Sequence, residues 1–238
     1  MFNDKNRLLL YAVFPSCFTL ILIALYFSGI EFLQSITSPA TQREFGLIEN
    51  AQNILLLLSA LLCWRTSRSE SCNHWKWFWR MGVLASLFLF MEEIDWGDHY
   101  WSLLTGTHRP SGEYFNIHNQ GNITRWLKKI VDGGSVVVFI LIPLAMKRLP
   151  LKIQSLVPDI HSALTLLCGL LTSKLAHALE NAGMNNNGSL LNNISEFRET
   201  FTYWVGLLYL WEVAQRRKRS HDQAAVTDNS TGNTNQNT

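Results

Sequence analysis

The sequence predicts an all-α, polytopic membrane protein: a bundle of about six transmembrane helices with an outward-facing polar site. Three observations support this fold class. The chain contains several apolar runs of about 20 residues, the length that a helix needs to cross the hydrocarbon core of a bilayer. Nearly all of its nine Trp residues lie at the ends of those runs, as in an interfacial aromatic belt. The polar residues are gathered into loops and a C-terminal tail.

The apolar runs define the expected spans. The first begins after Lys5 and Arg7 and is too long for the apolar part of a signal peptide, so we expect it to be retained as a helix. Pro15 and Pro143 lie inside spans, where they are tolerated if neighbouring groups satisfy the carbonyls that they free. The expected spans, within a transmembrane domain of residues 1–219, are 8–29, 45–64, 78–99, 130–147, 160–180 and 197–214.

The charged residues predict that both termini face the cytoplasm. With the N-terminus inside, most Lys and Arg residues fall in inner loops, which is the bias that orients multi-pass proteins. Most Asp and Glu residues then fall on the outer half. Acids contribute little to orientation, so a shared outward-facing site is the candidate cause. The tail, residues 220–238, is rich in Asn, Thr, Gln and Ser, and we expect a disordered cytoplasmic end.

Several functional classes are disfavoured by composition. The net charge of +2, without a basic patch interleaved with aromatics outside the membrane borders, argues against nucleic-acid binding. The four cysteines have no paired spacing, so we interpret them as small buried thiols. No inverted repeat of the transporter kind is visible between the two halves of the chain.

The strongest candidate site is the end of the third span. There Glu92 and Glu93 directly follow a continuous apolar run. Carboxylates at membrane depth are costly and usually face a protein interior or a wet cavity. Helical spacing places Glu92, Asp95 and His99 on one face, with Glu93 and Gly97 on the adjoining strip.

Other outer segments are expected to bring polar side chains to the same depth. The short segment 122–130 reads either as an interfacial helix that contacts anionic lipid headgroups or as the frayed start of the fourth span. The supporting candidates from the other helices and the 100–129 loop are Glu49, Asn119, Lys174, Glu180, Glu196 and Glu199, and those from the third span are Trp96 and Gly97.

The residue types suggest two kinds of chemistry. Divalent metals such as zinc, which would keep one position open for water, have as candidate ligands His118, His177, Glu92, Glu93 and His99. Their spacing matches no recognised zinc motif. Without a metal, adjacent carboxylates raise one another's pKa, so that one can act as a general acid near neutral pH.

Structural roles explain many of the same residues. Lys174 is most simply a counter-ion of the nearby acids. His177 suits a hydrogen bond between helices as well as it suits a metal. Glu196 and Glu199 open a helix, where acids complement the helix dipole. His161, on the inner side, is expected to be solvated.

Two short motifs resemble a family of bacterial inner-membrane proteins of uncharacterised activity. Residues 92–97, followed by 116–119, are similar to the family's Glu-Glu-Ile-Ser-Trp-Gly-Gln run and its later Asn-Leu-His-Asn. Asp95 stands where the family has Ser, and Asp98 where Gln is usual, which weakens a catalytic role for both. The resemblance spans about residues 45–200 and implies no activity. The positions that it favours are Glu92, Glu93, Trp96, Gly97, His118 and Asn119.

The leading hypothesis is a hydrolase or transferase, metal-dependent or not, that acts on a lipid or lipid-linked substrate. Glu92 and Glu93 would be metal ligands or a general base, while His118 and His177 would be ligands or proton shuttles. Ceramidase-like membrane hydrolases offer an analogy at the level of the fold only, because this chain lacks their paired transmembrane histidines.

Two other hypotheses belong to different classes. One is a non-enzymatic accessory or binding protein of the membrane, in which the polar network is structural. The other is a cation-coupled transporter, which is disfavoured because Glu212 and Asp159 are the only inner acids near the spans.

Overall fold

The computed structural model describes residues 4–37, 46–107, 126, 129–130, 133–183 and 190–232, and within these ranges every regular element is helical. The all-α prediction is therefore confirmed. The main helices are α1 (Asp4–Leu8) and α2 (Phe14–Tyr26), joined by a π-helical turn (Leu9–Val13), then α3 (Glu31–Thr37), α4 (Leu47–Ser69), α5 (Asn73–Glu93), α6 (Asp98–Thr105), α8 (Ile142–Leu144), α9 (Leu151–Gln154), α10 (Ser162–Asn181) and α11 (Leu190–Gly232).

Three described helices are long and apolar enough to cross a membrane: Asp4–Tyr26, Leu47–Ser69 and Ser162–Leu179. The fourth expected span contains a shorter apolar helix, Gly133–Leu144. The third expected span, 78–99, is not one helix, because α5 ends at Glu93 and the turn at Asp95–Gly97 breaks the helical spacing that was expected for Glu92, Asp95 and His99. The sixth expected span lies within α11, and α5 and α11 both carry more charge than those three helices. The structure thus supports membrane association, and the count of six spans stays a prediction.

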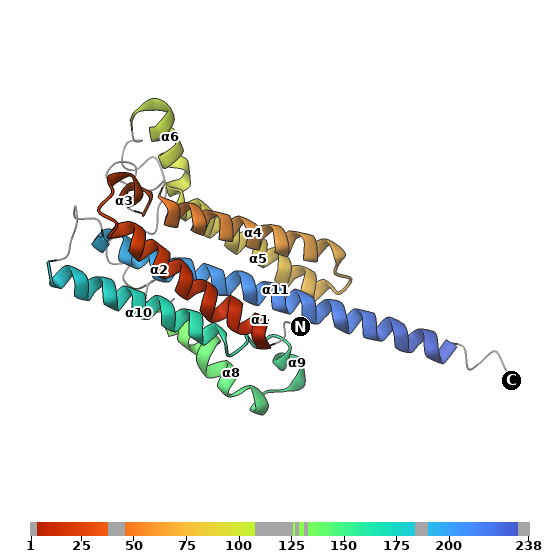
Figure 1. Cartoon of the computed structure of the whole chain (residues 1–238). Coiled ribbons are helices and arrows are strands. Elements are labelled where there is room, and N and C mark those ends of the chain that lie inside the picture. The colour runs from red at the N-terminus through yellow and green to blue at the C-terminus, as the bar shows by residue number, and fades with distance from the viewer. Residues whose placement is uncertain are drawn as a thin grey trace.

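Helix α11 lies at the centre of the bundle. Figure 1 shows α4 and α5 on one side of it and α2 and α10 on the other, and α11 contacts α4, α10 and α2. The inner part of the core joins Cys63, Trp79 and Val213, all fully buried, from α4, α5 and α11. Close packing of these side chains holds the α4–α5 hairpin against α11.

Both prolines within the apolar helices are accommodated in the same way. Each follows a π-helical turn, Leu9–Val13 before α2 and Val137–Leu141 before α8. Proline lacks the N–H that would bond the carbonyl four residues earlier. The freed carbonyl oxygen of Tyr11 accepts a hydrogen bond from Thr165 Oγ1 at 2.5 Å, and that of Phe139 accepts one from Ser162 Oγ at 3.4 Å.

Close approach of α10 to α11 requires a glycine. A Cβ added to Gly169 would lie 3.0 Å from Cδ2 of Phe201 and 3.6 Å from the Cα of Arg198. Small residues at helix interfaces permit this spacing in membrane proteins.

We expect Gly169→Leu to lower the free energy of unfolding by about 1–3 kcal/mol, because the added side chain overpacks the interface. Thermal unfolding in detergent measures the loss. Gly206→Leu is the matched control, since nothing lies within 4 Å of a Cβ at Gly206. Equal effects at the two positions would contradict the proposed packing role.

The described residues cover part of the C-terminal tail, and the expectation of a disordered cytoplasmic end stays a prediction. Helix α11 continues to Gly232, through residues for which composition predicts disorder, and Figure 1 shows this part extending beyond the other helices. No Pro or Gly occurs between Gly206 and Gly232, so nothing in the chain ends the helix earlier. The tail has few apolar side chains to bury, but a helix satisfies its backbone hydrogen bonds within its own segment and does not need such side chains.

Candidate functional site

The predicted site at the end of α5 is a sharp turn. Asp95, Trp96 and Gly97 all have positive φ, at 47°, 51° and 88°. The left-handed region costs a non-glycine residue about 1–2 kcal/mol, so Gly suits the third position and the other two need support. Trp96 supplies it, because its Nε1 donates a hydrogen bond to Glu92 Oε1 at 2.7 Å and its ring packs edge-on against Phe88.

The second carboxylate of the pair joins two helices. The hydroxyl of Tyr203, on α11, donates a hydrogen bond to Glu93 Oε1 at 2.5 Å. One turn earlier on α11, Thr200 accepts a hydrogen bond from Gln52 Nε2 of α4 at 3.1 Å. Glu49 is buried three residues before Gln52, on the same face of α4. Polar side chains therefore join α4 and α5 to α11 at this end of the bundle.

The other predicted residues are distributed differently. Lys174 and His177 are exposed on α10, which packs against α11 and the first helix, whereas Glu92 and Glu93 end α5. Glu199 is half-buried on α11, one turn before Tyr203. Asp98 is 2% exposed, so it does not reach the aqueous surface. The residues that fall outside the described positions or side chains are His99, His118, Asn119, Glu180 and Glu196.

Within the described part of the chain, no three His, Cys, Asp or Glu side chains lie close enough together to hold a metal ion. Glu92 accepts a hydrogen bond from Trp96, and Glu93 accepts one from Tyr203. A metal site that includes His118 stays a prediction.

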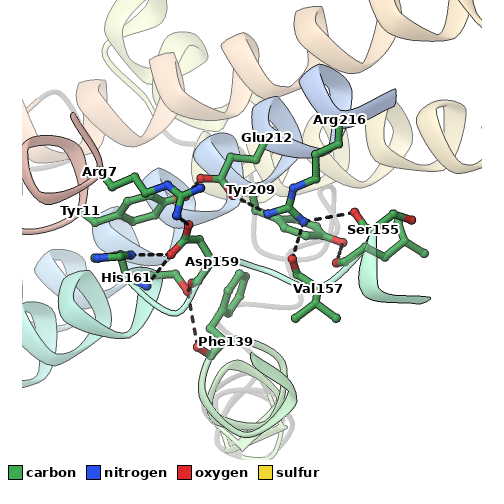
Figure 2. Close-up of polar contacts among 12 residues, drawn as sticks. Arg7, Tyr11, Phe139, Ser155, Val157, Asp159, His161, Tyr209, Glu212 and Arg216 are labelled. Carbon is green, nitrogen blue, oxygen red and sulfur yellow. Dashed lines mark hydrogen bonds and ion pairs between the residues drawn. The ribbon is translucent and has the colours of Figure 1, made fainter. Parts of the chain in front are cut away.

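A second polar cluster, at the opposite end of the bundle, centres on the buried carboxylate of Asp159 (Figure 2). Arg7 Nη1 lies 3.0 Å from Asp159 Oδ2. Asp159 Oδ1 accepts a hydrogen bond from the backbone N–H of His161 at 2.9 Å, and the ring Nδ1 of His161 lies 2.6 Å from the same oxygen. His161 is therefore half-buried against a carboxylate, which differs from the expected solvated position because the turn that precedes α10 folds its ring back.

The same cluster continues onto α11 through Glu212. Tyr11 donates its hydroxyl to Glu212 Oε1 at 3.1 Å, and Arg216 Nη2 donates to Glu212 Oε2 at 3.0 Å. Arg216 Nη1 also donates to the carbonyl oxygens of Ser155 and Val157. As Figure 2 shows, these contacts connect the first helix, α11 and the segment that precedes α10.

The surroundings of Asp159 favour its charged form. Burial raises the pKa of this carboxyl, but the hydrogen bonds from His161 and the positive charge of Arg7 outweigh burial and hold the pKa below its ordinary value. A buried, ionised Asp159 thus neutralises Arg7 in the folded protein.

A third polar contact lies where α4 turns into α5. Arg217 donates from Nε to Glu70 Oε2 at 3.2 Å and from Nη2 to Glu70 Oε1 at 3.0 Å. The backbone N–H of Cys72 donates to Glu70 Oε1, and the guanidinium of Arg217 lies 4.6 Å from the centre of the Trp75 ring. This arrangement suits arginine, whose planar fork binds a carboxylate in two places and stacks on aromatic rings.

The sequence analysis named Asp159 and Glu212 only as inner acids near the spans, and it assigned no role to Glu70 or to the partners of the three acids. Arg7 was read only as an orienting charge, although Asp159 binds it 152 positions later. One signal was present in the sequence, because Glu212 and Arg216 have the i, i+4 spacing of a helical ion pair.

Comparison of the chain with protein-family models, curated proteins and solved structures gives no match.

Proposed function

We propose that this chain is a multi-pass membrane protein with a non-enzymatic binding or accessory role, in which the buried polar groups hold the helices together. The observation that carries this proposal is the pair of polar contacts between helices that are far apart in the sequence, Glu93 with Tyr203 and Gln52 with Thr200. Polar side chains that hydrogen-bond across helices stabilise a helix bundle in a membrane. Contacts of this kind are what a structural role requires.

The clusters around Asp159 and Glu70 support the same interpretation. Each links segments that are far apart in the sequence, with a carboxylate that is mostly buried and an arginine that faces it. Buried charges in pairs of this kind are costly to separate. They fix the register of the helices against one another, and this leaves the outer surfaces of the helices to bind a partner or lipid.

A comparison of Glu93→Ala with Glu93→Gln separates a structural role of Glu93, as a hydrogen-bond acceptor, from a catalytic or metal-binding role. The Gln side chain keeps an oxygen that accepts the Tyr203 hydroxyl, so we expect it to retain most of the stability. The Ala variant leaves that hydroxyl without its acceptor and should lose about 1.5–3 kcal/mol of unfolding free energy in detergent. Tyr203→Phe, which removes the donor, should add little to the loss in the Ala background.

The hydrolase hypothesis makes opposite predictions. If Glu93 is catalytic or binds a metal, Glu93→Gln should lose the activity or the metal as fully as Glu93→Ala does, because neither side chain carries the charge. Metal analysis of the protein purified without chelators tests the same point. Bound zinc that is lost in both Glu93→Gln and His118→Ala would overturn the proposed role, whereas equal metal content in all three proteins supports it.

A further inference from the structure

Helices α4 and α11 lie side by side and run in the same direction. Gln52 bonds Thr200 at one end of their contact, and Glu70 bonds Arg217 at the other. At 1.5 Å per residue, the 17 positions from Thr200 to Arg217 cover about 26 Å. This length approaches the hydrocarbon thickness of a bilayer, about 30 Å.

A groove of about 830 Å³ follows this contact. It lies within the size range of ligand pockets, about 300–1,000 Å³. Apart from Leu10, in the π-helical turn before α2, its apolar lining comes from one face of each helix, with the i, i+3, i+4 spacing that such a face requires. The residues on these two faces are Leu58, Leu61 and Leu62 on α4, and Trp204, Leu207, Leu208, Trp211 and Ala214 on α11.

The charged residues of the groove lie at one end only. Arg65, Arg217 and Lys218 line that end together with Glu70. Arg217 is bound to Glu70, while Arg65 and Lys218 are exposed. A smaller hollow of about 260 Å³ shares Trp211 and Gln215 with the groove and adds further arginines, including the exposed Arg219. The groove is therefore apolar along most of its length and cationic at its end.

We propose that this groove binds an anionic phospholipid, with an acyl chain along the leucines and tryptophans and the phosphate against Arg65 and Lys218. The proposal rests on the proposed function, since it names the class of molecule that the protein binds. Charge complementarity selects the headgroup, because basic side chains at a membrane surface attract anionic lipids, each by about a factor of five. The predicted topology places this end of the groove at the cytoplasmic surface, beside the headgroups of the inner leaflet.

Delipidated protein in a neutral detergent, titrated with phosphatidylglycerol or phosphatidylcholine and followed by native mass spectrometry, measures the preference directly. We expect wild type to retain phosphatidylglycerol selectively. Replacing both exposed cations, in Arg65→Gln/Lys218→Gln, should lower the affinity for phosphatidylglycerol by roughly 30-fold and leave phosphatidylcholine unchanged. The matched control is Arg68→Gln/Lys147→Gln, which removes two exposed cations that do not line the groove.

A second variant tests the apolar part. Leu61→Trp places a larger side chain in the groove and should weaken the binding of phosphatidylglycerol, while unfolding of the lipid-free variant stays near that of wild type because Leu61 is 51% exposed. Loss of affinity in the control pair equal to that in the groove pair would overturn the proposal. So would equal retention of the two lipids by wild type.

The same samples separate the lipid site from the proposed function. If phosphatidylglycerol is bound selectively and recovered intact, both proposals are supported. If it is bound selectively and consumed, the site stands and the non-enzymatic role fails. If it is recovered intact without selective binding, the lipid site alone fails.

Discussion

Replacing Asp159 with Ala is expected to lower the free energy of unfolding by about 3–5 kcal/mol, because it removes the buried counter-charge of a buried arginine. The side chains of Asp159 and Arg7 are 6% and 12% exposed and lie 3.0 Å apart. Arg7 Nε is itself buried without a hydrogen bond. The substitution also removes the acceptor of the His161 backbone N–H. Unfolding by SDS titration in mixed micelles measures the loss.

Asp4 provides a matched control for this prediction. It is the same residue type and lies 4.0 Å from the same arginine, but its side chain is 95% exposed. Exposed ion pairs contribute about 0–1 kcal/mol, so Asp4→Ala should change the free energy of unfolding by at most about 1 kcal/mol. Equal losses for Asp4→Ala and Asp159→Ala would show that burial of the Arg7–Asp159 pair contributes nothing.

The stability that Asp159 contributes should depend on pH. The native pKa of this carboxyl is held below its ordinary value of about 4. A lowered native pKa means that the contribution is complete above the ordinary value and is lost as the pH falls through the native one. The difference in unfolding free energy between wild type and Asp159→Asn should therefore be constant near neutral pH and shrink below about pH 4. A difference that grows on acidification would contradict the assignment.

The sequence was most informative where local chemistry decides the structure. Pro15 and Pro143 each free a carbonyl at a known offset, and the expectation that neighbouring groups would satisfy those carbonyls is met by Thr165 and Ser162. The apolar runs located the helices for the same reason, since length and composition act within one segment. Charged helices were harder to interpret, because Lys76 and Arg80 on α5 reduce the apolar character of a helix that still packs against α4.

The partners of the polar residues could not be predicted in the same way. That Glu92 and Glu93 need partners follows from the cost of a charge at membrane depth. That Glu93 binds Tyr203 depends on the register between α5 and α11, which are 110 positions apart at this contact. His161 was misjudged because its exposure depends on a turn that brings its ring back to Asp159. Single-sequence patterns specify faces of helices and leave open how those faces meet.

Breaking the contact between Glu70 and Arg217 is the other substitution with a large expected effect. The side chain of Glu70 is 2% exposed and accepts hydrogen bonds from Arg217 and from the backbone of Cys72. We expect Glu70→Ala to cost about 3–5 kcal/mol, because the arginine then loses the charge that it faces. Arg217→Lys should also be costly, since lysine offers neither the two-point geometry nor the stacking on Trp75.

A double-mutant cycle isolates this contact from general damage to the helices. The combined loss in Glu70→Ala/Arg217→Ala should be smaller than the sum of the two single losses, because the first substitution already breaks the contact. Arg219→Ala, an exposed neighbour on the same helix, serves as the control and should change stability by less than about 0.5 kcal/mol. Strict additivity in the cycle would mean that α4 and α11 are held together at this end by Trp79 and its apolar neighbours alone, and that Glu70 serves only to end α4.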